Sequence, residues 1–196
     1  MTKIFAHRGA SAYAPENTME AFELAAKQGA DGIELDVHVT KDGEVVVTHD
    51  EKIDRVSNGS GFIKDMTLRE LKRLSFHNHM ESYVGAGIPT LREVLEYVST
   101  TNMDVNIELK TGIYWYPQIE EKTAFIVQET GMHDRVIYSS FNHHSIAKIK
   151  EIDSTAETAW LFSDVILDVE KYAKQNGVEG LHPTVYHMYM SDFMKR

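Results

Sequence analysis

The sequence contains no cysteine. Disulfide bonds, thiolate metal ligands and a cysteine nucleophile are therefore excluded from its chemistry. It also lacks any apolar run approaching the roughly 20 residues that a membrane-spanning helix requires. The first chemical motif, around His7, follows Met1 too closely for a secretory leader. We therefore expect a cytoplasmic protein without a transmembrane segment.

Basic residues are scarce. Lys and Arg total 20 against 30 Asp and Glu, which gives a formal net charge of −10. This balance argues against a nucleic-acid partner, because such proteins carry basic surfaces. The 196 residues, 42% hydrophobic and 26% charged, are otherwise ordinary for a globular protein. They indicate a single domain, 1–196, that is large enough to bury a core.

Short apolar runs alternate with stretches whose apolar residues recur at helical spacing. This alternation is typical of an α/β protein with a parallel sheet and helices outside it. Helices are predicted after Asn17-Thr18, near Pro117 and after Ser163-Asp164, each ending at a glycine. The predicted strands lie at 3–7, 32–37, 104–109, 135–140, 157–162 and 178–182.

Two segments break this rhythm. Asp42-Gly43 is a hairpin signal, so 44–49 is predicted to run antiparallel to 33–40. A two-residue turn would place His49 directly opposite Asp36, whereas a three-residue turn with a bulge at Gly43 shifts the register by one. The second break is 51–90, which we interpret as an insertion over one end of the sheet.

Helix starts within and after that insertion carry the same short sequence. Thr67-Leu68-Arg69-Glu70 and Thr90-Leu91-Arg92-Glu93 both match the capping box, with Thr at the N-cap and Glu three residues later. The repeat therefore predicts two helix starts and does not indicate a binding motif.

Polar residues alternate with apolar ones on two of the predicted strands. Glu34 and Asp36 share one face of their strand, and Glu108 and Lys110 share one face of theirs. Groups at the carboxyl ends of parallel strands meet at one edge of a barrel or open sheet. These side chains can therefore converge.

The residue types suit cleavage of a phosphodiester. Histidine shuttles protons near neutral pH, carboxylates bind hard divalent cations, and arginine forks onto phosphate oxygens. His7, in Ala6-His7-Arg8-Gly9, and His49, in Thr48-His49-Asp50, are the candidate proton carriers. Gly9 would let the backbone approach a ligand closely.

Each of these residues also has a structural explanation. A carboxylate on a strand is exposed and without function about as often as not, and a lone histidine is more often structural than catalytic. Three carboxylates on short apolar strands are harder to explain in this way, because burying unpaired charge is costly. A bound cation would remove that cost.

Taken together, the motifs closely resemble those of the glycerophosphodiester phosphodiesterases. They occur in the family's order and spacing over about residues 5–185, and no single one is specific by itself. The matching stretches are Ala6-His7-Arg8-Gly9-Ala10, Pro15-Glu16-Asn17-Thr18, Gly32-Ile33-Glu34-Leu35-Asp36-Val37, Thr40-Lys41-Asp42-Gly43, Thr48-His49-Asp50, Ile88-Pro89-Thr90-Leu91, Ile107-Glu108-Leu109-Lys110 and Ser140-Phe141.

The resemblance implies a TIM-type (β/α) barrel with a hairpin after its second strand. It implies metal-dependent hydrolysis of glycerophosphodiesters to sn-glycerol 3-phosphate and an alcohol, in lipid and glycerol metabolism. The implied roles are an acid-base pair, His7 and His49; a cation site, Glu34, Asp36 and Glu108; phosphate contacts, Arg8 and Lys110; and a substrate-groove residue, Phe141.

The carboxylate set favours Mg²⁺ or Ca²⁺ over Zn²⁺, with Mn²⁺ as a third option. Two other functions remain open. One is a lyase-like phospholipase acting on lipid head groups, which would release a cyclic phosphate. The other is an inactive relative that only binds a phosphoester or a protein.

The resemblance weakens after Leu181-His182-Pro183. Family members continue with two strands that close the barrel, and no stretch of this sequence matches them. We therefore expect a barrel that is open beside its first strand. Closing residues outside this sequence, strands from another chain in a homo-oligomer, or a compromised fragment would each account for this.

Overall fold

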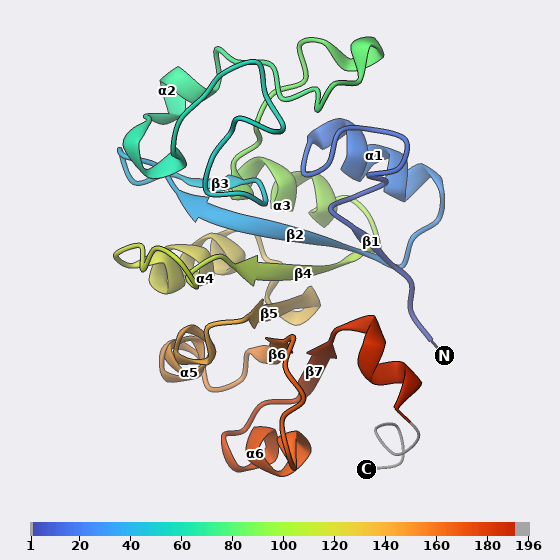
Figure 1. Cartoon of the computed structure of the whole chain (residues 1–196), viewed down its shortest axis with the longest axis vertical. Coiled ribbons are helices and arrows are strands. Elements are labelled where there is room, and N and C mark those ends of the chain that lie inside the picture. Colours follow the sequence, from blue (N-terminus) through green and yellow to red (C-terminus); the bar gives the residue numbers. More distant parts are fainter. Residues whose placement is uncertain (1, 191–196) are drawn as a thin grey trace.

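The computed structural model describes residues 2–190 and contains one curled, mainly parallel sheet of seven strands. The strand order is β1-β2-β4-β5-β6-β7, and β3 pairs antiparallel with β2 (Figure 1). This agrees with the predicted α/β class. The strands are β1 (Phe5–His7), β2 (Gly32–Val39), β3 (Val45–Val47), β4 (Asp104–Leu109), β5 (Val136–Ser140), β6 (Glu157–Phe162) and β7 (Gly180–Pro183).

Six α-helices connect the strands. They are α1 (Met19–Lys27), α2 (Leu68–Leu71), α3 (Leu91–Ser99), α4 (Ile119–Glu129), α5 (His143–Ile152) and α6 (Val169–Gln175). Four short 3-10 helices, η1 (Ile63–Asp65), η2 (Glu81–Tyr83), η3 (His133–Arg135) and η4 (Val185–Tyr189), complete the described part.

Local capping determines where several helices start. Thr67 and Thr90 both form the complete capping box, so both predicted helix starts are confirmed. The predicted start of α6 after Ser163-Asp164 was too early, because this helix begins at Val169. Leu167 is 81% exposed, so the residues before α6 lack the packing that stabilises a helical turn.

The β2–β3 hairpin has the shifted register. Val37 pairs with Val47, and the Thr48 amide donates to the Asp36 carbonyl at 3.0 Å. Of the two registers that the turn allowed, the structure has the one set by a three-residue turn, and Asp36 lies opposite Thr48 rather than His49. Thr40 closes a three-residue loop onto Glu44, and Gly43 has a φ of 89°, which an L-residue rarely adopts.

The two faces of the sheet differ in chemistry. On β2, Ile33, Leu35 and Val37 are fully buried in the main hydrophobic core, which also includes residues of α1, α3 and α4. Glu34 and Asp36 alternate with these residues and so lie on the opposite, inner face of the curled sheet. The apolar face packs against the helices, and the polar face is left for the site.

Gly9 is required by a helix contact. Its φ is 77°, and a Cβ at this position would lie 2.7 Å from the backbone carbon of Ala21 in α1. Close approach of the loop to α1 is thus one reason for the glycine, and the expected close approach to a ligand stays a prediction. The loop between β1 and α1 is thereby held against the helix that follows it.

Residues 51–90 form a second, smaller hydrophobic cluster beside β3. Figure 1 shows this segment, cyan to green, at the top of the view with α2. The side chains that build the cluster are Val46, Ile53, Val56, Ile63, Leu71, Phe76 and Ile88. The segment therefore shares a small core with Val46 of β3 and lies beside β2, the strand that carries Glu34 and Asp36.

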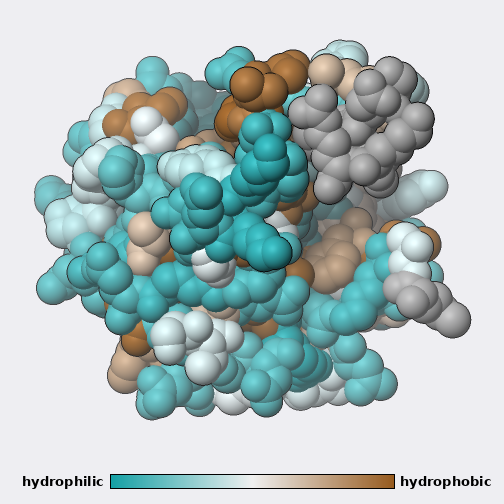
Figure 2. All heavy atoms as spheres, turned by 90° about the horizontal axis from the view of Figure 1, so that it is seen from below, coloured by the Kyte–Doolittle hydropathy of each residue, from teal (hydrophilic) through white to brown (hydrophobic). Residues whose placement is uncertain are grey.

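Among residues 2–190, β1 pairs only with β2, and β7 pairs only with β6. The face in Figure 2 is mostly hydrophilic, with a few hydrophobic patches. The expected lack of closing strands concerns the end of the chain, where 191–196 lie outside the described residues, and it stays a prediction.

No helix in the described part has both the length and the apolar character needed to cross a bilayer.

Candidate active site

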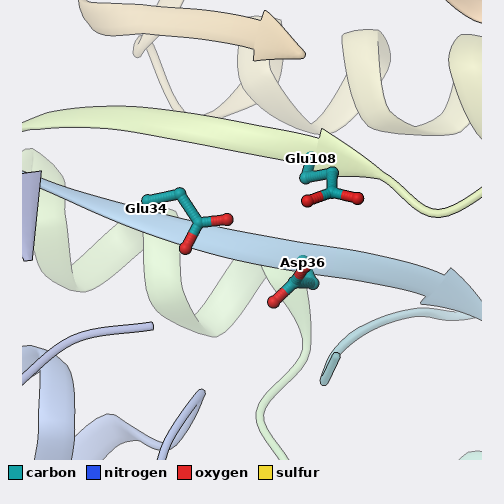
Figure 3. A group of neighbouring side chains, drawn as sticks. All are labelled: Glu34, Asp36 and Glu108. Carbon is teal, nitrogen blue, oxygen red and sulfur yellow. The ribbon is translucent and has the colours of Figure 1, made fainter. Parts of the chain in front are cut away.

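Three carboxylates converge on the inner face of the sheet. Glu34 and Asp36 extend from β2, and Glu108 extends from the adjacent β4 (Figure 3). One oxygen atom from each lies within 4.8 Å of the other two. The register explains the convergence, because Asp36 pairs with Glu108 across the two strands. The predicted grouping of these three acids is thus present in the structure.

Burial makes this cluster electrostatically costly. Burial and the neighbouring Asp36 and Glu108 carboxylates raise the pKa of Glu34 from 4.5 to about 8. Burial and Asp36 also raise the pKa of Glu108, although Lys110 opposes the shift. Without a cation, Glu34 therefore holds a proton at neutral pH. A divalent cation would allow all three groups to ionise.

Unsatisfied polar atoms at the cluster fit a cation. Asp36 is 1% exposed, and its Oδ1 accepts no hydrogen bond within the described part of the chain. Its Oδ2 accepts from the Asn17 side-chain amide at 2.8 Å, which fixes the orientation of the carboxylate. A buried acceptor without a donor is rare, so Oδ1 has the character of a ligand atom.

Two basic side chains flank the acids. The Lys110 ammonium lies 2.8 Å from Glu108 and 3.7 Å from Asp36, and these carboxylates raise its pKa against the opposing effect of burial. Arg8 lies 3.6 Å from Asp36, and its backbone amide donates to Glu34. The Arg8 Nε atom is buried and makes no hydrogen bond to any described residue. A donor that can bind an anion therefore lies beside the acids.

His7 ends β1 beside Glu34, the residue with which it pairs in the sheet. Its Nε2 lies 3.8 Å from the Glu34 carboxylate. Burial and the positive charge of Arg8 lower the pKa of His7, so the imidazole is neutral at pH 7. A neutral imidazole can accept a proton, as an acid-base residue must.

His49 follows β3 and points its Nδ1 at Asp50, 2.6 Å away. It is close enough to the site for its charge to act on both His7 and Glu108. The two predicted histidines therefore belong to the same electrostatic neighbourhood as the acids. They reach it along the same edge of β2, where the Arg8 amide after β1 donates to the Glu34 carbonyl and the Thr48 amide after β3 donates to the Asp36 carbonyl.

The buried His38, near the carboxyl end of β2, also contributes to the site. His38 bonds to the His49 backbone carbonyl through Nε2 and to the Tyr116 hydroxyl through Nδ1. Burial lowers the pKa of His38 to about 4, so it is neutral and Nε2 carries the hydrogen. The Tyr116 hydroxyl then donates to Nδ1. This chain of hydrogen bonds holds the backbone of His49.

Other residues of the β1–α1 loop escaped assignment from the sequence. Glu16 accepts from Arg8 at 3.0 Å, and Asn17 holds Asp36. Asn17 has a φ of 57° and donates its backbone amide to the Arg8 carbonyl. The helix-start signal at Asn17-Thr18 hid this role, because Thr18 alone caps α1.

Some aromatic residues near the site pack against the 51–90 segment, and others are exposed to solvent. Tyr114 packs edge-on against Phe62 of the 51–90 segment. Trp115 is 71% exposed, and Phe141, directly after β5, is 49% exposed. Phe141 is therefore accessible at the carboxyl end of its strand.

Comparison with known proteins identifies the family to which this arrangement belongs. The family described as glycerophosphoryl diester phosphodiesterase matches residues 7–194. The chain belongs to this family. The match covers all the residues described above, from His7 to Phe141. It confirms the resemblance that the motifs indicated.

Relatives and solved structures agree with this. A glycerophosphodiester phosphodiesterase of Bacillus altitudinis is 48% identical, with 94% of this chain and 76% of that protein covered. One from Caldanaerobacter subterraneus subsp. tengcongensis is 44% identical, with 95% and 77% covered.

Among solved structures, a glycerophosphodiester phosphodiesterase of Agrobacterium tumefaciens is 32% identical with a TM-score of 0.83. An Oleispira antarctica phosphodiesterase, solved with the product sn-glycerol-3-phosphate, is 28% identical with a TM-score of 0.90. In both comparisons the match covers 100% of this chain and 81% of the chain in the solved structure. The sheet of this chain therefore has the barrel-type arrangement of its family, and the family's enzymes hydrolyse glycerophosphodiesters.

The raised pKa of Glu34 predicts how cation binding depends on pH. Below about pH 8 the cation must displace the Glu34 proton, so affinity is expected to rise about tenfold per pH unit and then level off. Titration calorimetry at pH 6, 7 and 8, in buffers of different ionisation enthalpy, measures both the affinity and the released proton.

The raised pKa of Glu34 also affects the stability of the cation-free protein. As the pH rises, cation affinity is expected to increase, whereas stability is expected to decrease. A raised carboxyl pKa means that the folded, cation-free protein binds a proton that the unfolded chain lacks between pH 4.5 and about 8. Its melting temperature should fall as the pH rises through this range, and added cation should restore it. In Glu34→Gln, both the cation affinity and the melting temperature of the cation-free protein should depend less on pH. A cation affinity that is constant from pH 6 to 8 in the unaltered protein would contradict the assignment.

Proposed function

We propose that this chain is a phosphoric diester hydrolase that cleaves glycerophosphodiesters to sn-glycerol 3-phosphate and an alcohol with the help of one divalent cation. The observation that carries the proposal is the buried cluster of Glu34, Asp36 and Glu108, flanked by Arg8 and Lys110. In the sequence these residues stand in the motifs that resemble those of the family. Residues 1–196 act as one catalytic barrel domain in which 51–90 is an insertion.

The three carboxylates hold the cation. Their oxygen donors suit Mg²⁺ or Ca²⁺, with Mn²⁺ as an alternative, because these hard ions prefer carboxylate ligands. When bound, the cation would neutralise charge on the phosphoryl oxygens and orient the phosphodiester. The buried Oδ1 of Asp36, which accepts no hydrogen bond in the described part of the chain, supports this assignment.

Arg8 and Lys110 bind the phosphate. The three carboxylates carry three negative charges. A divalent cation would supply two positive charges, and Arg8 and Lys110 supply one each. The cluster would then have a net charge of plus one. A phosphodiester monoanion would bring this to neutrality. Fixed positive charge is then in place for the additional charge that develops on the phosphoryl oxygens, and preorganised charge of this kind is a large contribution to catalysis.

His7 and His49 transfer the protons. One imidazole takes a proton from the attacking hydroxyl, which belongs to water or to the neighbouring glycerol hydroxyl, and the other protonates the departing alcohol. The neutral state of His7 and its position beside Glu34 support its role. Exposed Phe141 lines the groove that receives the rest of the substrate.

The direct test is hydrolysis of glycerophosphocholine by the purified chain, followed by product analysis. We expect sn-glycerol 3-phosphate and choline in equal amounts, loss of turnover with EDTA, and recovery when Mg²⁺, Ca²⁺ or Mn²⁺ is added back. A cyclic phosphate as the final product would indicate the lyase-like alternative. Absence of turnover with every cation, while the chain still binds the product, would indicate a phosphoester-binding relative.

A further inference from the structure

One arginine of the 51–90 segment joins two acids behind the site. The Arg55 guanidinium donates to Asp50 through Nε at 2.7 Å and through Nη2 at 3.2 Å. It also donates to Glu16 through Nη1 at 2.9 Å and through Nη2 at 2.8 Å. Both of its terminal nitrogen atoms and Nε are thus used in hydrogen bonds to these two acids.

We propose that Arg55 is a positioning residue for the reaction: by holding Asp50 behind His49 and Glu16 behind Arg8, it orients the acid-base imidazole and the phosphate-binding guanidinium together. The inference rests on the proposed function of His49 and Arg8. It assigns a role in the reaction to the 51–90 segment, which otherwise lies beside the site.

The link to His49 sets which ring nitrogen reacts. Burial opposes ionisation of Asp50, but hydrogen bonds from Arg55 and His49 lower its pKa to about 2. An ionised carboxylate only accepts hydrogen bonds, so the His49 Nδ1 at 2.6 Å must carry the hydrogen. When His49 is neutral, its Nε2 therefore has the lone pair. The same relation between acid and imidazole orients catalytic histidines in other hydrolases.

The link to Arg8 works through Glu16. Oε1 of Glu16 accepts both from Arg8 Nη1 at 3.0 Å and from Arg55 Nη2 at 2.8 Å. This bond holds one end of the Arg8 guanidinium, while its Nε makes no hydrogen bond to a described residue and lies 3.6 Å from Asp36. The ion pair with Arg55 keeps Glu16 ionised, because it lowers the pKa of that carboxyl against the effect of burial.

The geometry requires arginine. Nη2 of Arg55 contacts Asp50 and Glu16 at once, so one planar group joins a residue after β3 to a residue before α1. A lysine ammonium offers its donors from a single point and cannot span two carboxylates in this way. Arg55→Lys should therefore keep the positive charge but lose the simultaneous hydrogen bonds to Asp50 and Glu16.

A purely structural role makes a different prediction. The Arg55 side chain is 44% exposed, and ion pairs at such positions stabilise a fold only slightly. If Arg55 only attached the segment, its removal would alter melting temperature at most and leave turnover unchanged. If it positions His49 and Arg8, turnover should fall with little change in stability.

The experiment compares Arg55→Ala and Arg55→Lys with Arg73→Ala in the full chain. Arg73 is an exposed arginine of the same segment and takes part in none of the ion pairs of the described residues. With glycerophosphocholine at saturating cation, we expect kcat to fall about 10- to 100-fold in Arg55→Ala, since small misplacement of catalytic groups has effects of this size. Arg55→Lys should lie between Arg55→Ala and the unaltered chain, and Arg73→Ala should stay within about twofold.

Two further measurements separate positioning from folding. Asp50→Asn and Arg55→Ala should together reduce kcat by much less than the product of their separate effects, because both break the same link. Nitrogen NMR of the His49 ring reads the position of its hydrogen directly. We expect the Nδ1-H form in the unaltered chain and a mixture of both forms in Arg55→Ala.

Turnover of Arg55→Ala equal to that of Arg73→Ala would overturn the proposal, and so would a loss of kcat fully explained by a lowered melting temperature. An unaltered chain that is inactive on glycerophosphodiesters would instead refute the proposed function. The NMR result is independent of turnover, and an unchanged His49 ring in Arg55→Ala would refute the positioning role even in an active enzyme.

Discussion

Replacing either site histidine by alanine is expected to reduce kcat by about 10² to 10⁴, the usual contribution of general acid-base catalysis. His7→Ala removes the neutral imidazole beside Glu34, and His49→Ala removes the imidazole held by Asp50. The two losses should be of comparable size, because the reaction needs one proton taken and one delivered. Steady-state hydrolysis of glycerophosphocholine at several pH values measures both.

The matched control is His133→Ala. His133 lies in η3 and forms an ion pair with Asp153. Because η3 precedes β5, His133 is at the opposite end of β5 from the site. It should retain the activity of the unaltered chain. Cation affinity should also change little in His7→Ala and His49→Ala, since neither side chain is assigned as a ligand. Turnover that survives both histidine changes would remove these residues from the mechanism.

Glu34→Gln is expected to weaken cation affinity by at least about tenfold and to reduce turnover with it, because an amide is a poorer ligand for a hard cation than a carboxylate. The same change should leave the cation-free protein at least as stable as before at pH 8. Glutamine removes a charge whose burial, together with repulsion from Asp36 and Glu108, raises the pKa of Glu34 to about 8. Calorimetric titration and thermal unfolding without cation test the two effects.

Glu44→Gln makes the same chemical change at an exposed position of the β2–β3 hairpin. It should alter neither cation affinity nor the pH dependence of stability. The combination of weaker binding and an unweakened cation-free fold is specific to a ligand, since loss of a structural carboxylate would destabilise the protein in both states. An unchanged cation titration in Glu34→Gln would count against the assignment of this residue.

Short-range chemistry explains why much of the fold could be predicted. Thr67 and Thr90 cap their helices through their own side chains, so the signal lies within four residues. Alternation on β2 puts Glu34 and Asp36 on one face and Leu35 on the other in any sheet. The start of α6 could not be predicted in this way, because it depends on whether Leu167 finds a packing partner.

The order and chemistry of the site motifs were readable from the sequence by itself, because residue type and strand alternation determine which groups point to the inner face. The tertiary structure alone decided how these groups meet. The three-residue hairpin loop shifted His49 by one position from Asp36, and the close approach of Gly9 to α1 placed the loop that carries Arg8. The bridge from Arg55 to Asp50 and Glu16 spans segments that are distant in the chain, and burial sets the protonation of Glu34. Contacts and desolvation of this kind depend on the packing of the whole chain, and no local pattern encodes them.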